Sequence, residues 1–399
     1  MSLVSPEGPW DLKEPLSLYI HVPFCRKKCG YCAFFSCDSF SLDQQKSWLD
    51  HLLTEWSTFL PLIQSRGVAS VYFGGGTPSL VNLDIWNTLL QELNLPTLRN
   101  PSIPLSRYAT VEVNPGTLSL EKLNLWSQGG VGRLSLGIQT FDPKVLHASG
   151  RLVNPGETEG ALELVKSHWS GEWSLDLIAG LPGQTHLGIL QDLKKALEWA
   201  PDHLALYEYI QEEGTPLDES IRQGLNVPGD ELRQLWWLEG RNYLEAQGYE
   251  NYEISNFALP GKQAIHNLAY WEMSPCLGLG PGAVSLLPTR DGWVRFSNPE
   301  TWDWSGNSQS PWGNRNVEKL SPQEHFQEIL LTGLRLQKGL SKSRFEFLTG
   351  KPWKNLWKGV NSLHQKYYRE DSETWGLTEE GRDRLDWLLQ RYDTSWINS

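Results

Sequence analysis

The chain has 399 residues, of which 39% are hydrophobic and 21% are charged. This length exceeds the ~250–300 residues at which single cores stop growing, so we expect one large domain plus a smaller one, or two domains of moderate size. The composition excludes a disordered chain, and no apolar run reaches the ~18–20 residues of a transmembrane helix. A net charge of −12 without a basic block argues against binding to nucleic acid phosphates. The first 15 residues have neither a basic segment nor an apolar stretch, so we expect no secretory signal.

The first two thirds of the chain alternate short apolar runs with amphipathic stretches. The spacing of the apolar residues predicts strands at 16–22, 70–73, 108–113, 133–138, 174–179 and 203–207, and helices at 43–64, 83–93, 119–128, 157–168 and 186–199. Strands that alternate with helices are typical of parallel βα units, in a barrel or in a doubly wound sheet. Polar and glycine-rich residues follow several of the strands. This distribution favours the barrel, because α/β barrels build their sites at that end of the strands, whereas a doubly wound sheet concentrates them at one switch point.

The last third of the chain follows a different pattern. Residues 231–247 are expected to form a long helix, and residues 302–315 form a polar stretch with Gly and Pro that is typical of a linker. Residues 321–399 are expected to form a small helical, winged-helix-like module. We therefore predict an α/β domain over 12–300 and a C-terminal domain over 315–395.

Cysteine usage points to a metal site. Four of the five cysteines lie within the first 37 residues, and three of them follow the first predicted strand as Cys25-x-x-x-Cys29-x-x-Cys32. Three thiolates on one loop can hold three irons of a [4Fe–4S] cube and leave the fourth iron for a small molecule. Zinc usually takes two C-x-x-C pairs, and the sequence has no second pair. The clustering indicates a reduced, cytoplasmic protein, and Cys37 is interpreted as structural.

A glycine-rich segment, Gly74-Gly75-Gly76-Thr77-Pro78, follows the second predicted strand. Glycines let the backbone approach a ligand closely, although such turns are common by themselves. Together with the cysteine loop, and with Tyr31 directly before its third cysteine, this segment resembles the radical S-adenosylmethionine (SAM) enzymes.

The resemblance extends over most of the chain, from about residue 16. Six further features are similar to the oxygen-independent coproporphyrinogen III oxidase family: residues 19–25, 73–78, 112–115, 135–139 and 176–184, and Arg151. The resemblance implies a partial (β/α)6 radical SAM barrel, a cluster on Cys25, Cys29 and Cys32, and a bound SAM. The residues that it implies for cofactor binding are Tyr19, Tyr31, Gly74, Gly75, Gly76, Thr77, Glu112, Gln139, Arg151 and Asp176.

Four of these residues have physical roles that suit SAM. Glu112 and Asp176 are acidic groups at strand ends that can bind a cationic sulfonium ligand or its ribose. Gln139 and Arg151 can bond ribose hydroxyls and a carboxylate. The alternatives are ordinary salt bridges for the two acids and a helix cap for Arg151.

Two branches of this family differ at identifiable positions. The oxidases carry a fourth cysteine two places after the third, where this chain has Phe34, and they have a longer N-terminal extension than the 18 residues that precede Tyr19 here. The HemW-type heme chaperones are marked by H-N-x-x-Y-W, which matches residues 266–271 of this chain. Val284, in contrast, stands where we expect many relatives to carry His.

The resemblance therefore implies a heme chaperone without oxidase activity. Its partners would be heme and acceptor hemoproteins, such as respiratory or photosynthetic cytochromes at a membrane surface, with no nucleic acid. The expected heme-binding residues are His266, Asn267, Tyr270 and Trp271. His266 is the candidate iron ligand because imidazole is a usual donor to heme iron, with Cys276 as its rival. The alternative is that His266 and the aromatic residues only pack in the core.

Two enzymatic alternatives stay open. One is radical oxidative decarboxylation of coproporphyrinogen III in porphyrin biosynthesis, and the other is a radical SAM methylase. The sequence also leaves open whether SAM is cleaved and whether the protein is a monomer or a homodimer.

Overall fold

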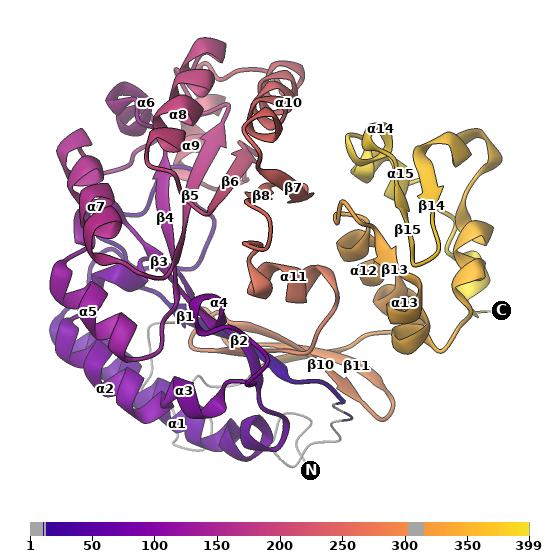
Figure 1. The fold of residues 1–399 in the computed structure, drawn as a ribbon, viewed down its shortest axis with the longest axis horizontal. Coiled ribbons are helices and arrows are strands. Elements are labelled where there is room, and N and C mark those ends of the chain that lie inside the picture. The colour runs from indigo at the N-terminus through magenta and orange to yellow at the C-terminus, as the bar shows by residue number, and fades with distance from the viewer. Residues whose placement is uncertain (1–10, 12, 302–314, 399) are drawn as a thin grey trace.

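The computed structural model describes residues 11, 13–301 and 315–398. Figure 1 shows a large α/β domain and a smaller C-terminal domain beside it. Within the described residues, the large domain contains a sheet with the strand order β12-β11-β10-β9-β1-β2-β3-β4-β5-β6-β8-β7. The C-terminal domain contains a second sheet in the order β13-β15-β14.

The strands of the large sheet are β1 (Leu16–Val22), β2 (Val68–Gly75), β3 (Ala109–Val113), β4 (Arg133–Gln139), β5 (Glu172–Ala179), β6 (His203–Glu208), β7 (Glu250–Glu253), β8 (Asn256–Ala258), β9 (Cys276–Leu279), β10 (Val284–Thr289), β11 (Gly292–Ser297) and β12 (Asn316–Lys319). The small sheet consists of β13 (Leu340–Ser341), β14 (Tyr368–Glu370) and β15 (Thr374–Leu377).

The α-helices are α1 (Leu42–Arg66), α2 (Leu83–Leu93), α3 (Leu95–Leu98), α4 (Leu105–Tyr108), α5 (Leu120–Gln128), α6 (Pro143–Ala148), α7 (Pro155–His168), α8 (His186–Glu198), α9 (Pro216–Arg222), α10 (Asp230–Ala246), α11 (Ile265–Trp271), α12 (Pro322–Gly333), α13 (Lys342–Thr349), α14 (Glu379–Arg382) and α15 (Leu385–Leu389). Short 3₁₀ turns cover Pro78–Leu80, Pro115–Thr117, Trp353–Gly359, Ser362–Tyr367 and Ser395–Asn398. In the described part of the chain, no helix is both long enough and apolar enough to cross a membrane.

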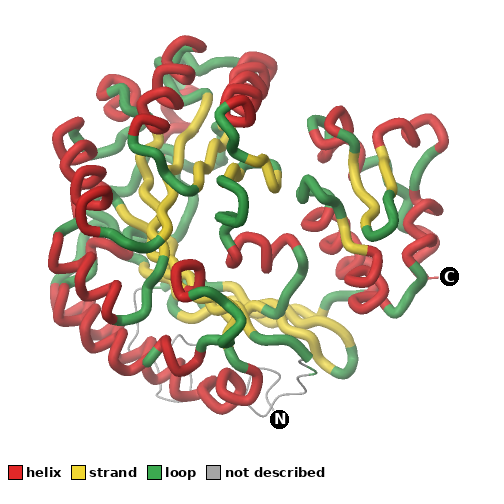
Figure 2. The backbone as a smooth tube through the Cα atoms, viewed as in Figure 1, coloured by secondary structure: helices red, strands yellow, loops and turns green. Residues whose placement is uncertain are grey.

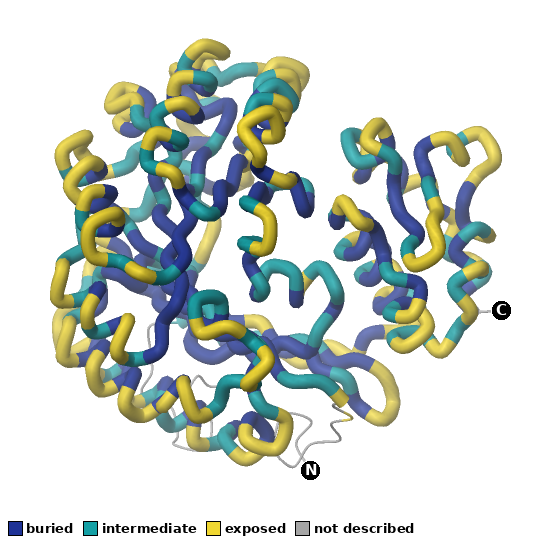
Figure 3. Tube along the Cα trace, viewed as in Figure 1, coloured by how far each residue is buried: buried dark blue, intermediate teal, exposed yellow. Residues whose placement is uncertain are grey.

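The six predicted strands and their parallel pairing are confirmed. Strands β1 to β6 pair in sequence order, each parallel to the next. The strands lie inside a layer of helices, as Figure 2 shows. Burial follows the same layering: strands β1 to β6 are mostly dark blue in Figure 3, and the outer faces of the helices are largely yellow. This arrangement is a partial (β/α)6 barrel, because the connections between parallel strands run through helices on the outside.

The helix starts have local causes in the sequence. Ser41 and Gln44 form a capping box at the start of α1, since each side chain bonds the backbone N–H of the other. Asn154 and Glu157 form the same motif at the start of α7, where Pro155 occupies the first turn. These contacts satisfy N–H groups that have no partner within the helix, so they fix where each helix begins.

The sheet extends beyond the six predicted strands. On one side, β9 pairs parallel with β1, and β10, β11 and β12 continue the sheet antiparallel. On the other side, β8 pairs antiparallel with β6, and β7 with β8. Strands β12 and β7 are the two ends of the described sheet, so the barrel is open. Helix α11 lies at this open side, between the two added groups of strands and facing the C-terminal domain (Figure 1).

The C-terminal domain has its own core, which includes Phe326, Phe345 and Trp375. Its elements follow the order α12, β13, α13, two 3₁₀ segments, β14 and β15. This combination of helices with a three-stranded sheet confirms the winged-helix-like module. The predicted linker falls largely on residues 302–314, which lie outside the described residues. The domain boundaries 12–300 and 315–395 stay a prediction.

Candidate functional site

The three cysteines of the motif lie on a loop that directly follows β1. Two backbone hydrogen bonds hold this loop. Cys25 N–H donates to Cys37 O at 2.8 Å, and Gly30 N–H donates to Ser149 O at 2.9 Å. Gly30 O in turn accepts from Leu217 N–H at 2.7 Å. Contacts from distant parts of the chain therefore hold the loop in one conformation.

The cysteine sulfurs have polar neighbours. Thr77 Oγ1 lies 3.7 Å from Cys25 Sγ, and Arg151 Nη1 lies 3.6 Å from Cys29 Sγ. Burial raises the pKa of Cys25 and of Cys32. A thiol that binds a metal is deprotonated, so iron would reverse this effect. Three soft sulfur donors beside a cation and a hydroxyl fit an iron–sulfur cluster chemically.

Among the described residues, no three His, Cys, Asp or Glu side chains lie close enough together to hold one metal ion. In a cube, each thiolate binds a different iron. The three cysteines therefore do not have to converge on one point.

The glycine-rich segment ends β2 with no room for side chains. A Cβ on Gly74 would lie 2.7 Å from the Tyr72 ring, and one on Gly76 would lie 2.8 Å from Phe24 O. Gly75 has a φ of +108°, and its Cβ would lie 2.4 Å from the His21 ring. The segment requires glycine at all three positions, because its backbone lies directly against β1 and β3.

Glu112, at the end of β3, is held by two donors. The Tyr72 hydroxyl donates to Oε1 at 2.8 Å, and Gly75 N–H donates to Oε2 at 3.1 Å. Burial nevertheless raises the pKa of Glu112 to about 7. The carboxyl therefore changes its charge near neutral pH, and a cation placed beside it would favour the ionised form.

Asp176, on β5, is the second buried acid. Ser135 Oγ donates to both of its oxygens, at 3.1 and 3.0 Å, and Ser174 Oγ donates to Oδ1 at 3.3 Å. Burial raises the pKa of Asp176 to about 6. Ser135 and Ser174 thus orient the carboxylate toward the barrel interior, where no cation is hydrogen-bonded to it within the described residues.

Arg151 reaches the end of β4 from the loop after α6. It donates to Gly137 O and lies 3.3 Å from the Tyr31 hydroxyl, and its buried Nε has no hydrogen-bond partner in the described part of the chain. Gln139 ends β4 with a φ of +69°. A left-handed conformation is unusual for a residue other than glycine and is often found at functional sites. The side chain of Arg151 thus bridges the cysteine loop and the end of β4, rather than capping a helix.

Three neighbouring cavities lie beside the residues just described. The first, of about 410 Å³, is lined by the cysteine loop and by Glu112, Gln139, Arg151 and Asp176. The second, of about 580 Å³, is lined in part by Tyr19, His21, Cys276 and Val284. The third, of about 930 Å³, lies between the barrel and the C-terminal domain. Phe34 is 67% exposed and lines all three, so the cavities adjoin one another.

Helix α11 places the H-N-x-x-Y-W residues along the third cavity. His266, Asn267, Tyr270 and Trp271 all line it. The His266 ring stacks on Tyr72 with 5.0 Å between centroids and meets the Tyr270 ring edge-on at 4.9 Å. Tyr19 lines the second and third cavities rather than the first, and its hydroxyl lies 3.0 Å from His21 Nδ1.

The protonation of His266 follows from its partners. Ser70 Oγ donates to Ser17 Oγ at 3.1 Å and accepts from His266 Nδ1 at 2.9 Å. The buried Nε2 has no hydrogen-bond partner in the described part of the chain, and burial lowers the pKa of His266 to about 3. At neutral pH the imidazole is therefore uncharged, with its proton on Nδ1 and a lone pair on Nε2.

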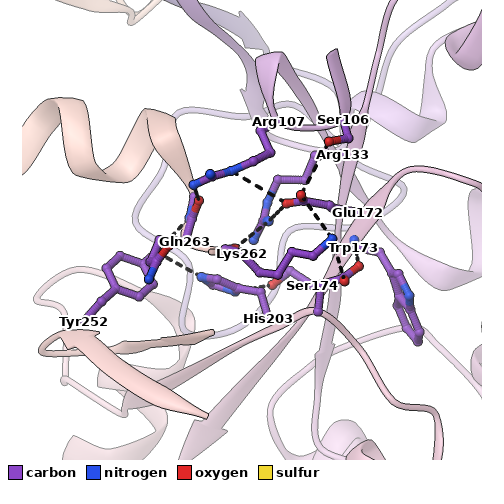
Figure 4. Close-up of polar contacts among 12 residues, drawn as sticks. Ser106, Arg107, Arg133, Glu172, Trp173, Ser174, His203, Tyr252, Lys262 and Gln263 are labelled. Atoms are coloured by element: carbon purple, nitrogen blue, oxygen red, sulfur yellow. Dashed lines mark hydrogen bonds and ion pairs between the residues drawn. The ribbon is translucent and has the colours of Figure 1, made fainter. Parts of the chain in front are cut away.

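The segment that precedes α11 is anchored to residues at the starts of β4 and β5, and Figure 4 shows the polar contacts. Arg107 Nη2 donates to Gln263 O at 2.6 Å, and Arg133 Nη1 donates to Lys262 O at 3.3 Å. Buried Glu172 lies 3.4 Å from Arg133 Nη1 and 3.3 Å from Lys262 Nζ. A buried carboxylate with several cationic partners is stable, and this cluster fixes the backbone from which α11 starts.

A chain of hydrogen bonds connects the same segment to Asp176. Ala264 N–H donates to the Tyr252 hydroxyl at 3.4 Å, and this hydroxyl lies 2.9 Å from His203 Nε2. His203 Nδ1 lies 2.9 Å from Ser174 Oγ, which donates to Asp176. The start of α11 and one acid of the first cavity therefore share one polar network.

The structure brings most of the predicted site residues together. The three cysteines, Tyr31, Gly75, Gly76, Thr77, Glu112, Gln139, Arg151 and Asp176 line the first cavity. Gly74 is not among its lining residues but packs against Glu112. Sequence reasoning missed Tyr72, Ser135 and His21, which hold Glu112, Asp176 and Tyr19. Each lies within or next to a segment that resembles the family, which is the only signal that pointed to them.

Comparison with known proteins shows the family to which the chain is similar. Residues 19–199 match the Radical SAM superfamily, and residues 320–384 match the HemN C-terminal domain. The heme chaperone HemW of Haemophilus influenzae is 33% identical over 389 residues, which cover 95% of this chain and 98% of that protein. The heme chaperone HemW of Escherichia coli is 32% identical over 388 residues, with the same coverage of both chains.

One solved structure extends the likeness in fold to nearly the whole chain. Coproporphyrinogen III oxidase (HemN) from Escherichia coli, a radical SAM enzyme, superposes with a TM-score of 0.77 at 23% identity. The match covers 96% of this chain and 90% of that one, and it confirms the predicted α/β radical SAM fold with its C-terminal domain. The chain therefore belongs to the radical SAM proteins of the HemN family, within the group whose relatives are named heme chaperone HemW.

Proposed function

We propose that this protein binds heme and delivers it to acceptor hemoproteins, such as respiratory or photosynthetic cytochromes at a membrane surface. The observation that supports this most directly is helix α11: it lines a cavity of about 930 Å³ with His266, Tyr270 and Trp271. Flat aromatic walls and one neutral nitrogen donor suit an iron porphyrin. A cytoplasmic location stays a prediction.

His266 is the proposed iron ligand. Metal-binding histidines usually have their second ring nitrogen fixed by a hydrogen bond, as Ser70 fixes Nδ1 here. Because Nε2 is buried, a neighbouring side chain has to move before iron can bind. We propose Tyr270, which is 38% exposed, for that movement. Cys276 is the weaker candidate, since burial raises the pKa of its thiol to about 11 and only the thiolate is a good ligand.

The family implies two further cofactors. Cys25, Cys29 and Cys32 would hold a [4Fe–4S] cluster, and residues of the first cavity would hold SAM next to it. When bound, such a cluster supplies one electron and an iron with an open position. Arg151 would bind the SAM carboxylate through its free Nε–H, and Glu112 and Asp176 would attract its positive charges. Gln139 would bond the ribose, and Tyr31 would pack on the adenine.

A heme titration of the anaerobically reconstituted protein tests the proposal, followed by the Soret band. We expect His266→Ala to shift or abolish this band and to weaken heme binding at least about tenfold, because even indirect partners of a metal ligand contribute about 10–100-fold. Folding and cluster content should stay intact.

His325→Ala is a matched control for this titration. His325 is also buried with an unpartnered Nε2 among the described residues, and it stacks on Trp293 at 5.1 Å, but it lines a separate cavity. This variant should lose stability and keep the heme spectrum. If His266→Ala behaves like His325→Ala while Cys276→Ala changes the spectrum, the ligand is Cys276. Conversion of coproporphyrinogen III to protoporphyrinogen IX by the reduced protein would instead favour the oxidase alternative.

SAM binding is expected to depend on pH through Glu112. Its pKa of about 7 means that the carboxyl loses its charge as the pH falls from 8 to 6. Binding of a cation should therefore weaken about tenfold over this range, as linkage requires for one group. Calorimetry at both pH values measures this. Glu112→Gln should bind SAM weakly at both pH values. If the pH dependence of SAM affinity persists in Glu112→Gln and vanishes in Asp176→Asn, the titrating group is Asp176.

A further inference from the structure

The wall of the third cavity that faces α11 belongs to the C-terminal domain and carries cationic side chains. Arg335 and Arg382 line the same cavity as Tyr270 and Trp271. A cavity with aromatic walls and a few polar groups selects ligands that are flat and carry charge at one edge.

Within the described residues, the side chain of Arg335 makes no hydrogen bond, and other contacts hold it in place. The residue after it, Leu336, forms a backbone bridge with Glu253 of β7, and Gln337 N–H donates to Tyr252 O at 3.0 Å. The guanidinium lies over the Trp271 ring, 4.4 Å from its centroid. Its only ion pair among the described residues is with Glu253 Oε2 at 3.5 Å. Its buried Nε has no hydrogen-bond partner there.

Glu253 does not fully satisfy Arg335. Its Oε1 already accepts from Ser255 N–H at 2.8 Å and from Asn256 Nδ2 at 2.5 Å, whereas Oε2 accepts no hydrogen bond from the part of the chain that the structure describes. Arg335, whose side chain is 25% exposed, therefore keeps donors that make no hydrogen bond within the described residues. Because Trp271 already orders the guanidinium, an arriving carboxylate would bind it with little further loss of conformational freedom.

Arg382 also lacks a carboxylate partner. Within the described chain it donates to Asn251 Oδ1 at 3.0 Å and forms no ion pair. The nearby Arg241, in contrast, is paired with Asp383 and Glu379, both at 2.8 Å. Burial and the charge of Arg241 lower the pKa of Arg382, against the opposite effect of the nearby carboxylates of Asp383 and Glu379. The negative charge of an anion in the cavity would add to the effect of these carboxylates and favour the charged guanidinium.

The partners of the two guanidinium groups lie on the same strand. Arg335 pairs with Glu253, and Arg382 donates to Asn251, two residues earlier on β7. Two residues of extended chain span at most about 7 Å, which limits the distance between these two anchoring points on the backbone. Both arginines also line the same cavity, so one ligand there can contact both. We propose that Arg335 and Arg382 bind the two propionate carboxylates at one edge of the porphyrin, with the macrocycle against Trp271. This inference rests on the proposed heme function and adds the orientation of the ligand, propionates toward the C-terminal domain.

The test compares heme with its dimethyl ester, which has the same macrocycle and iron but no carboxylates. Both are titrated into the reconstituted full-length protein. We expect the ester to bind at least about tenfold more weakly than heme, since hydrogen bonds to charged groups are about twice as strong as neutral ones. This comparison needs no variant, so it does not depend on the folding of a mutant.

Variants then assign the residues. Arg335→Gln and Arg382→Gln should each weaken heme binding by about tenfold and leave binding of the ester unchanged. Arg384→Gln is the control: Arg384 borders the same cavity but is paired with Glu380 at 3.7 Å. The propionate site would be wrong if the wild type bound heme and ester with equal affinity. It would also be wrong if Arg384→Gln lost as much heme affinity as Arg335→Gln and Arg382→Gln. Either result would leave the proposed heme binding itself intact. If neither compound binds, the proposed function itself is wrong.

Discussion

Replacement of any one of Cys25, Cys29 and Cys32 by alanine is expected to prevent assembly of the proposed iron–sulfur cluster. Each thiolate would hold a different iron, so a missing one would leave two irons of the cube without a protein ligand instead of one. The structure places the three cysteines on one short loop beside a shared cavity, which offers no substitute thiol among its described lining residues. The iron and sulfide contents of the reconstituted variants, together with their visible absorbance, measure the loss.

Cys37→Ala is the matched control for these variants. Cys37 belongs to the same loop, but its side chain bonds Ser39 O at 2.9 Å, and its link to Cys25 runs through the backbone, which alanine keeps. This variant should assemble the cluster at the level of the wild type. A full complement of iron in Cys29→Ala would show that the cluster is held elsewhere.

Gly75→Val is expected to be the most damaging single change in the glycine-rich segment. The positive φ strains any side chain by about 1–3 kcal/mol, and the Cβ would collide with His21 at 2.4 Å, which adds about 1–3 kcal/mol of overpacking. The His21 ring cannot move freely, because Tyr19 and Phe35 O hold its two nitrogens. We expect the free energy of unfolding to fall by about 2–6 kcal/mol, the sum of the two contributions.

The same change should weaken SAM binding by at least about tenfold, because a shift of Gly75 removes the N–H that orients Glu112 at 3.1 Å. Gly183→Val separates backbone strain from this effect. Gly183 has a φ of +77°, but no atom lies within 4 Å of the position of its Cβ. It should lose stability through strain alone and keep its affinity for SAM, as measured by thermal unfolding and calorimetry. Unchanged SAM affinity in Gly75→Val would remove the segment from the site.

Local sequence determined the parts of the protein that depend on near neighbours. The cysteine motif occupies eight consecutive residues, and the glycine segment directly follows a predicted strand. Both can therefore be recognised from the sequence before the fold is known. The six parallel strands are apolar runs between amphipathic helices, which is the pattern that burial on both faces produces. These features predicted the barrel, the family and the residues around the first cavity.

Tertiary structure alone decided the rest, because the contacts that matter join residues far apart in the chain. Ser70 fixes His266 across 196 residues, and Tyr72 binds Glu112 across 40. Strands β7 to β12 are three to six residues long and lie at the two edges of the sheet, where so short a run carries no distinctive periodicity. These edge strands end the sheet on both sides, so the barrel is open. The tertiary structure also places Arg335 over Trp271, a contact that neither the segment around Arg335 nor the segment around Trp271 predicts by itself.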